Sequence, residues 1–214
     1  MSAKIKNIIF DLGGVILDID ESIISKELEK MGISVAELFH SKEFMDIMSK
    51  FDTGIYTAST FRKKVKAFIG QEKMTDQRFD SIWNSMLLDI PRERIEAIEK
   101  VKKHYKIFLM SNSNVIHYDL YVRDLQLRFG YNEFDELFNK SYFSFAEHLE
   151  KPDPNFFELL LDHEGLLPEE TLFIDDTAEN IKAAKSLGIN TYHIGREELV
   201  RNLFDNGVLK EGVV

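Results

Sequence analysis

Short apolar runs recur along the chain, and each of them closes on small or acidic residues. Runs of this length that are rich in isoleucine, phenylalanine and leucine are typical of strands buried on both faces of a sheet. The pattern predicts four such strands, and a weaker run predicts a fifth. The predicted strands cover residues 7–12, 106–113, 171–176 and 191–195, with the weaker one at 140–144.

Helical patterns lie between these strands. Residues 92–105 carry apolar side chains at positions 95, 98 and 101, which is the stripe of an amphipathic helix. Residues 155–166 and 178–189 show similar patterns, and Gly188 follows the last helical residues of the second as a C-terminal cap does. Strands that alternate with helices predict an α/β fold with a parallel sheet.

One long segment after the first strand breaks this alternation, because it shows helical periodicity and almost no strand signal. The simplest account is a helical insertion, with Thr57 or Ser59 as the N-cap of its third helix. We therefore expect a core of residues 1–18 and 91–214 and an inserted helical region of residues 19–90. The four helices predicted there cover residues 24–33, 35–51, 57–70 and 76–87.

The chain has 214 residues, which suits one domain or one domain with an inserted subdomain. Its net charge of −10 makes nucleic acid and anionic membranes poor partners, and an anionic substrate would need a local positive site. There are no cysteines, which excludes disulfides, thiol catalysis and thiolate metal sites. No signal-peptide pattern and no membrane-spanning apolar run are found, so we expect a cytoplasmic protein. The oligomeric state does not follow from the sequence.

Polar side chains close three of the predicted strands. Asp11 closes the first strand, Ser111 and Asn112 close another, and Asp175 and Asp176 close a third. Each of these residues alone is also typical of a strand-end turn or a helix cap. Ligands of open parallel sheets bind beyond the carboxyl ends of the strands, so the joint occurrence predicts a binding site at this edge.

Carboxylates that come this close repel one another, so we expect a positive charge among them. Oxygen ligands favour a hard ion such as Mg²⁺, which completes its shell with waters and phosphate oxygens. Lys151, in the stretch "EKPDPNFF", is a candidate for holding phosphate, although most lysines are simply solvated. Gly13 and Gly14 follow Asp11, and without side chains they let the backbone pass close to a metal and a phosphate.

Four stretches taken in order resemble the motifs of the haloacid dehalogenase-like hydrolases. They are "FDLGGV" around Asp11, "SN" at 111–112, "KP" at 151–152 and "DD" at 175–176. The helical insertion lies between the first and second motifs, where this family places its α-helical cap. The resemblance implies an α/β fold, with a Rossmann-like parallel sheet core and an inserted α-helical cap of the C1 type.

The resemblance also implies an Mg²⁺-dependent phosphatase that works through an aspartyl-phosphate. Asp11 would be the nucleophile, and Ser111 and Lys151 would hold the transferring phosphoryl group. Phosphoryl transfer is mostly positioning and charge neutralisation, and a carboxylate nucleophile splits hydrolysis into two easier steps. The implied metal ligands are Asp11, the Gly13 carbonyl, Asp175 and Asp176.

The match narrows to the branch of this family that includes bacterial α-D-glucose-1-phosphate phosphatases. It rests on "FDLGGVILDID", "SNSNVIH", "FDTGIYTASTF" and "DDTAENI". In that branch a segment similar to "DTGIYTASTF" forms a cap loop facing the active site, and Asp52 stands where a glutamate is common. The implied partner is a small phosphate ester, with a sugar phosphate such as glucose 1-phosphate expected. The substrate-binding residues expected are Leu12, Gly13, Ser111, Asn112, His117, Lys151 and Asp52.

Gly13 departs from the pattern of most phosphatases in this family, which carry a second aspartate there as general acid and base. A leaving group of low basicity, such as an anomeric oxygen, would lose less without that acid. Asp18, Asp20 and His117 are candidates to replace it. Each has another interpretation: Asp18 could fix the loop, Asp20 could cap the next helix, and His117 could lie on a helix surface.

Three other functions remain open from the sequence. A haloacid dehalogenase also lacks the second acid, but it needs no metal and would leave the "DD" pair unexplained. A phosphomutase of the β-phosphoglucomutase kind would share the core chemistry, but the second phosphate acceptor that it needs is not evident. A non-catalytic module that binds a phosphorylated ligand is disfavoured because the other motif residues are all present.

Overall fold

The computed structural model describes residues 4–195 and 198–213, and it contains a five-stranded parallel sheet in the order β3-β2-β1-β4-β5. The α/β fold with a parallel sheet is therefore confirmed, with the strand that precedes Asp11 at its centre. The three inner strands β2, β1 and β4 are almost wholly buried and their sequences are continuous apolar runs, whereas the edge strands β3 and β5 are partly exposed. The strands are β1 (Asn7–Phe10), β2 (Lys106–Ser111), β3 (Lys140–Phe143), β4 (Thr171–Asp175) and β5 (Asn190–His193).

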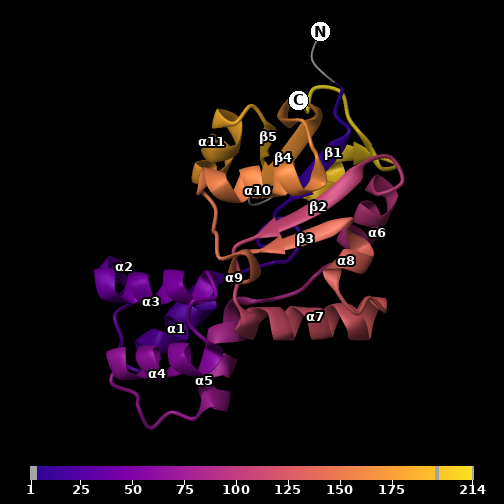
Figure 1. The fold of residues 1–214 in the computed structure, drawn as a ribbon. Helices are drawn as coiled ribbons and strands as arrows, with labels where there is room; N and C mark the ends of the chain where they lie inside the picture. The colour runs from indigo at the N-terminus through magenta and orange to yellow at the C-terminus, as the bar shows by residue number, and fades with distance from the viewer. Residues whose placement is uncertain (1–3, 196–197, 214) are drawn as a thin grey trace.

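Helices cover both faces of this sheet (Figure 1). Ile8 and Phe10 of β1 face one apolar cluster, which contains α6, α7 and α8, whereas Ile9 faces the cluster of α10 and α11. This alternation follows from the two-residue period of a strand. The helices are α6 (Arg92–Val101), α7 (Val115–Phe129), α8 (Phe134–Leu137), α9 (Ser144–Glu147), α10 (Pro154–Glu164) and α11 (Ala178–Ser186).

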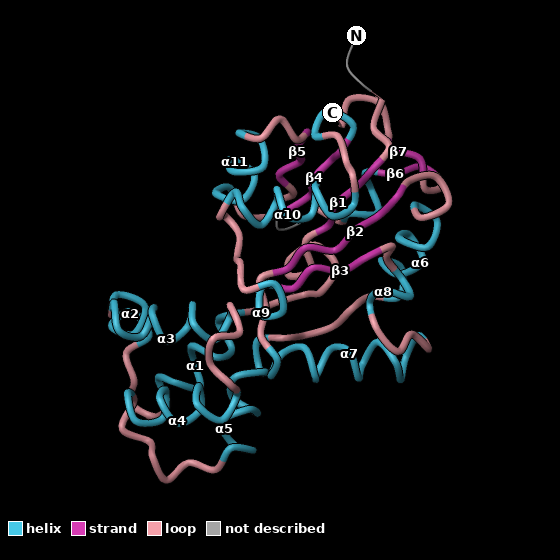
Figure 2. The backbone as a smooth tube through the Cα atoms, viewed as in Figure 1, coloured by secondary structure: helices cyan, strands magenta, loops and turns pink. Residues whose placement is uncertain are grey.

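Residues 21–86 form a separate group of helices beside the sheet, which we call the helical unit (Figure 2). The prediction of one helix over residues 35–51 is wrong, because the backbone is extended at Ser41 and its Oγ accepts from the Phe44 amide, which starts a new helix. Thr57 caps the following helix as expected. The helical unit contains α1 (Glu21–Lys30), α2 (Val35–His40), α3 (Lys42–Asp52), α4 (Ala58–Phe68), α5 (Asp76–Trp83) and the short η1 (Asn84–Met86).

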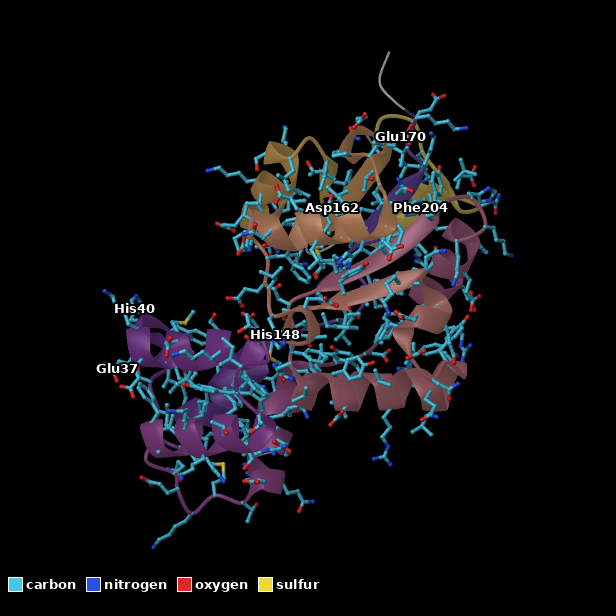
Figure 3. The ribbon with its side chains drawn as sticks, in the orientation of Figure 1. Glu37, His40, His148, Asp162, Glu170 and Phe204 are labelled. Atoms are coloured by element: carbon cyan, nitrogen blue, oxygen red, sulfur yellow. The ribbon has the colours of Figure 1, made fainter. Side chains whose placement is uncertain are left out.

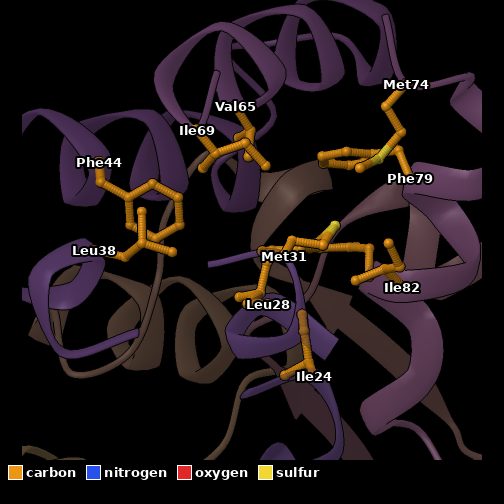
Figure 4. A pocket seen from close by; sticks show the side chains of 11 residues that line it. Ile24, Leu28, Met31, Leu38, Phe44, Val65, Ile69, Met74, Phe79 and Ile82 are labelled. Atoms are coloured by element: carbon orange, nitrogen blue, oxygen red, sulfur yellow. The ribbon is translucent and has the colours of Figure 1, made fainter. Parts of the chain in front are cut away.

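The helical unit has its own apolar core, in which Phe51 and Phe61 stack with ring centroids 3.8 Å apart. A cavity of about 30 Å³ remains between α1 and the other helices of the unit (Figure 4). The side chains lining this cavity are all apolar, apart from the Trp83 indole. A cavity of this size and lining offers neither the room nor the charge to hold a phosphate ester, so the substrate site lies elsewhere.

Two crossing segments join the helical unit to the sheet. Ile19 and Leu87 pair in an antiparallel bridge, and the Asp18 amide donates to the Asp89 carbonyl at 2.8 Å. Arg94 ties this crossing to the core, because its guanidinium contacts Asp18 Oδ1 at 2.6 Å. The domain boundaries at residues 19 and 90 lie at or next to these paired segments and stay a prediction.

The C-terminal segment, whose sequence predicted nothing, packs against the core. Gly207 has φ of 87°, and a Cβ there would meet the Lys100 carbonyl oxygen at 2.5 Å, so only glycine suits this approach. The segment contains η3 (Val200–Leu203), β6 (Phe204–Asp205) and β7 (Val208–Leu209). Within the described part of the chain, no helix is both long and apolar enough to cross a membrane.

Candidate active site

Lys151 lies at the centre of the site, between two carboxylates. Its Nζ donates to Asp11 Oδ1 at 2.6 Å, to Asp175 Oδ2 at 2.7 Å and to the Met110 carbonyl at 2.9 Å. An ammonium has three hydrogens, so these three acceptors use all of them. The Lys151 side chain is 1% exposed and that of Asp175 is fully buried. The positive charge expected among the carboxylates is thus supplied by the chain itself.

The register of the sheet brings these groups together. The Asp11 amide donates to the Ile174 carbonyl at 2.9 Å, which continues the pairing of β1 with β4 one residue beyond β1. Asp175 ends β4, so two carboxylates leave neighbouring strands at the same level. Ser111 ends β2 on the other side of β1 and is buried. The three strand ends therefore meet at the central strand, as expected for a sheet of this order.

Three acidic side chains could hold a metal ion here. Asp11, Asp175 and Asp176 each offer a carboxylate oxygen, and these oxygens lie within 4.8 Å of one another. Gly14 permits the approach of Asp176, because its φ is 72° and a Cβ at this position would meet Asp176 Oδ2 at 2.2 Å. A donor set made only of oxygens, most of them charged, fits Mg²⁺.

Two residues that the sequence analysis did not single out orient Asp175. The Asn180 amide nitrogen donates to both carboxylate oxygens, at 3.2 and 3.1 Å, and the Thr177 backbone amide donates to Oδ1 at 2.7 Å. Asn180 lies in the first turn of α11, five residues after Asp175. Because the helix starts directly beyond the strand end, an amide at this spacing points back at the carboxylate.

The protonation of the site depends on burial. Burial raises the pKa of Asp11 to about 7, although the nearby Lys151 ammonium opposes this shift. Burial would lower the pKa of Lys151, but Asp11 and Asp175 outweigh it, so that pKa is raised and the ammonium stays charged. Burial also raises the pKa of Asp176, helped by the charge of Asp175. A divalent cation among these oxygens would favour their ionised forms.

Asn112 clamps the backbone of Lys151. Its amide nitrogen donates to the Lys151 carbonyl at 2.7 Å, and its amide oxygen accepts from the Lys151 backbone amide at 2.8 Å. The sequence predicts that Asn112 binds substrate. In the structure both ends of its side chain contact the backbone of the residue whose ammonium joins Asp11 and Asp175.

We expect Asn112→Asp to lower kcat by about 10²-fold, the scale of a misplacement of about 1 Å in an active site. The new carboxylate would face the Lys151 carbonyl, where a donor is needed, and would push the loop away. Steady-state kinetics would measure the loss, with the exposed Asn202→Asp as the matched control. In a Lys151→Met background the same change should cost little more, whereas a full additional loss would show that Asn112 acts independently of Lys151.

The candidates for the missing acid occupy well-defined places. Asp18 pairs with Arg94, and the Asp20 side chain accepts from the Ser22 amide at 2.9 Å as the N-cap of α1. His117 is only 9% exposed, so the interpretation of it as a helix-surface residue is wrong. Burial lowers the pKa of His117 to about 4, which leaves its ring neutral near pH 7.

His117 is held at the junction with the helical unit. Its ring stacks on Trp83, with centroids 5.7 Å apart and planes 5° from parallel. Its Nδ1 lies 2.8 Å from Asn84 Oδ1, and its backbone amide donates to Asn114 Oδ1, which caps α7. The ring therefore contacts residues of the helical unit that sequence reasoning had not singled out.

The loop that follows α3 reaches the core at several points. The Asn114 amide nitrogen donates to Asp52 Oδ1 at 3.1 Å. Gly54 lies so close to Phe145 that a Cβ would meet its carbonyl oxygen at 2.1 Å. His148, labelled in Figure 3, has its Nδ1 2.8 Å from the Thr53 carbonyl oxygen. The end of α3 and the loop after it thus rest on the loops at the carboxyl edge of the sheet.

Leu12 and Gly13 are the remaining residues of the substrate-binding set that the sequence predicts. The Leu12 side chain is buried in the apolar core, so only its backbone is available to a ligand. Its backbone amide lowers the pKa of Asp11, against the larger effect of burial. A Cβ at Gly13 would meet Ile19 Cδ1 at 2.6 Å, so a larger residue would require Ile19 to move. The structure thus places both residues in the turn beside Asp11.

The sheet with its inserted helices and the lysine-bridged acidic cluster together define a class of hydrolase. A sequence model of the haloacid dehalogenase-like hydrolases matches residues 5–188, and the chain belongs to this family. D-ribitol-5-phosphate phosphatase of Bacteroides thetaiotaomicron is 29% identical over 189 residues, which cover 88% of this chain and 91% of that protein.

Solved structures agree with this assignment. A haloacid dehalogenase-like enzyme from B. thetaiotaomicron, an aspartate-to-alanine variant in complex with magnesium and inorganic phosphate, superimposes with a TM-score of 0.86. It is 31% identical, and the match covers 94% of this chain and 99% of that chain. The L-2-haloacid dehalogenase of Xanthobacter autotrophicus has a TM-score of 0.59 at 19% identity, over 91% of this chain and 79% of that chain, which is a likeness of fold alone.

Proposed function

We propose that this protein is an Mg²⁺-dependent phosphatase that hydrolyses phosphate monoesters of small sugars or sugar alcohols through an aspartyl-phosphate on Asp11. The observation that carries the proposal is the buried Lys151 ammonium, which joins the Asp11 and Asp175 carboxylates beside Asp176. This arrangement gives one nucleophilic carboxylate, one phosphate-binding cation and one acidic cluster for a metal. The family assignment and the phosphatase relative support it.

In the proposed reaction an Asp11 oxygen attacks phosphorus, and the bond from phosphorus to the ester oxygen breaks. Ser111 and the Lys151 ammonium hold the phosphoryl oxygens in line during this transfer. Water then hydrolyses the aspartyl-phosphate and regenerates the Asp11 carboxylate. Lys151 serves both states, because its charge offsets that of the carboxylate before the attack and that of the phosphoryl group after it.

Magnesium would be held by Asp11, the Gly13 carbonyl, Asp175 and Asp176. When bound it would supply charge neutralisation at the phosphoryl oxygens. Asn180 and the Thr177 amide keep Asp175 oriented for this role. The solved relative in complex with magnesium and inorganic phosphate supports a magnesium ion at the site of this chain.

The helical unit, with the residues that flank it, would form the cap predicted for residues 19–90. Its contacts with the core reach the loops after β2 and β3, next to Ser111 and Lys151. Closing this unit over a bound ester would exclude water from the phosphoryl group, and opening it would release the products. Asp52 and His117 lie at this junction and would contribute to substrate recognition.

The substrate is best tested by a phosphate-release screen over sugar and polyol phosphates with Mg²⁺. The anomeric leaving oxygen of glucose 1-phosphate is less basic than that of an ordinary alkyl phosphate. The B. thetaiotaomicron relative, in contrast, is a phosphatase of a sugar-alcohol phosphate, D-ribitol 5-phosphate. We expect turnover of one of these classes that chelation of Mg²⁺ abolishes and added Mg²⁺ restores. The absence of metal-dependent phosphate release across the screen would contradict the proposal, and release of halide from 2-haloacids without Mg²⁺ would favour a dehalogenase.

A further inference from the structure

The proposed reaction leaves one proton without a donor. An alkoxide that leaves phosphorus is a strong base and needs a general acid, and the water of the second step needs a general base. Gly13 has no side chain, Asp18 is paired with Arg94, and Asp20 caps α1. His117 is neutral and its Nδ1 is engaged by Asn84. On the proposed function, the donor must therefore be another group at the rim of the site.

Asp52 is a carboxyl that the fold brings to this rim from the helical unit. It is the last residue of α3, and its Oδ1 accepts from Asn114, three residues after Ser111. One turn earlier on the same helix, Ser49 Oγ donates to Glu150 Oε1 at 2.7 Å, directly before Lys151. The end of α3 is thus tied to both loops that carry the phosphate-binding groups.

The loop after Asp52 is equally fixed. The Thr53 carbonyl contacts His148, and Gly54 packs against the Phe145 backbone. Among the hydrogen bonds of the described residues, the Asp52 carboxyl takes one, from Asn114 to Oδ1, so Oδ2 is left to carry a proton. The carboxyl is therefore positioned by the core on one oxygen and chemically available on the other.

We propose that Asp52 protonates the leaving oxygen and then accepts a proton from the attacking water, in place of the side chain that Gly13 lacks. In the first step Asp11 bonds to phosphorus, the phosphorus–ester bond breaks, and the ester oxygen takes the Asp52 proton and leaves as an alcohol. In the second step the Asp52 carboxylate takes a proton from water as that oxygen bonds to phosphorus. The bond to Asp11 then breaks, phosphate is released and Asp52 is protonated again.

The electrostatics of the junction suit this role. Burial raises the pKa of Asp52 to about 7, with a smaller contribution from the negative charge of Glu150 and an opposing one from the Asn114 hydrogen bond. His148 is also at this contact, with its Nδ1 2.8 Å from the Thr53 carbonyl oxygen, whereas Lys50, two residues before Asp52 on α3, is paired with Asp46. A carboxyl that titrates near neutrality can both give and take a proton at working pH.

The decisive variant is Asp52→Asn, tested on the best alkyl phosphate substrate and on p-nitrophenyl phosphate, with Mg²⁺. We expect kcat/KM for the alkyl ester to fall by about 10²-fold, in the range of general acid catalysis. The nitrophenolate needs no proton to leave, so this ester should still give a burst of one equivalent per enzyme. Slow turnover should follow, because the aspartyl-phosphate accumulates without its base.

Asp46→Asn, the same substitution on the exposed face of α3, is the matched control and should behave like the wild type. An equal loss on both esters without a burst would overturn the proposal and assign Asp52 a purely docking role. Full activity of Asp52→Asn would overturn it as well, while leaving the proposed phosphatase intact. A wild-type protein without metal-dependent phosphate release would overturn the proposed function and this inference together.

A second measurement does not depend on the folding of Asp52→Asn. The Asp52 acid must be protonated to act, so kcat/KM of the wild type should fall as the pH rises through about 7. Asn114→Ser keeps a cap for α7 but removes the amide that lowers the pKa of Asp52, so the falling limb should move to higher pH. If the falling limb of the kcat/KM profile stayed at the same pH in Asn114→Ser, the proposed role of Asp52 would be overturned.

Discussion

Asp11→Asn should abolish phosphate release on every substrate, because an amide is neither a nucleophile for phosphorus nor a charged ligand for Mg²⁺. Lys151 would keep its contacts with Asp175 and with the Met110 carbonyl, and asparagine has nearly the shape of aspartate. We therefore expect the fold to survive. Phosphate release and acid-quench labelling with a ³²P substrate would together measure the effect, since the wild type should carry a labelled acyl-phosphate that the variant lacks.

Asp162→Asn, on the exposed face of α10, is the matched control and should retain both turnover and label. Turnover at the wild-type rate in Asp11→Asn would contradict the nucleophile assignment. Turnover retained without any acyl-phosphate in the wild type would favour direct attack by water. Each result thus separates a covalent mechanism from a direct one.

The centre of the sheet could be predicted from the sequence because β1, β2 and β4 are buried on both faces and read as continuous apolar runs. The strand preceding Asp11 is central in the sheet. Helix α7 was missed, because its stripe mixes tyrosines and buried His117 with charged residues. Its ends carried the better signal: Asn114 is the N-cap and Gly130 closes the helix with φ of 82°.

The candidate site was predictable only as far as strand ends determine it. The carboxyl ends of parallel strands must meet, so Asp11, Ser111 and Asp175 could be grouped without coordinates. The clamp of Asn112 on Lys151 could not, because it joins loops 39 residues apart. The contact of Asp52 with Asn114 spans 62 residues and depends on how the helical unit docks, which no local pattern encodes.

The general acid that Gly13 cannot supply is a second feature that the sequence alone could not locate. Asp18 and Asp20 were candidates because they follow Asp11 closely in the sequence. In the structure their partners are Arg94 and the first turn of α1. Asp52 is 41 residues from Asp11 in the sequence but lies at the junction beside the strand ends. Proximity along the chain thus did not single out Asp52, the carboxyl that we propose as the acid.

Lys151→Met should remove the one charge that lets Asp11 and Asp175 be buried side by side. Methionine fills similar space but leaves both carboxylates without their shared ammonium. Removing one partner of a buried ion pair typically lowers the free energy of unfolding by about 3–5 kcal/mol. Loss of the phosphate-binding charge should lower kcat/KM by at least about 10³-fold. This is the upper end of the range typical for removing one group that stabilises the transition state. Thermal unfolding and steady-state kinetics would measure the two effects separately.

The stability loss should depend on pH with a defined sign. Without the ammonium, the folded-state pKa of Asp11, which burial already raises to about 7, would rise further above that of the unfolded chain. The extra penalty in the variant is therefore complete above the variant's folded pKa, shrinks as the pH falls toward the wild-type folded pKa, and vanishes below it. The gap in Tm between wild type and Lys151→Met should accordingly narrow on acidification.

Mg²⁺ should raise the Tm of the variant more than that of the wild type, because it restores positive charge among the same oxygens. A variant as stable as the wild type at pH 8, or one whose Tm ignores Mg²⁺, would show that Lys151 is not what holds these carboxylates together.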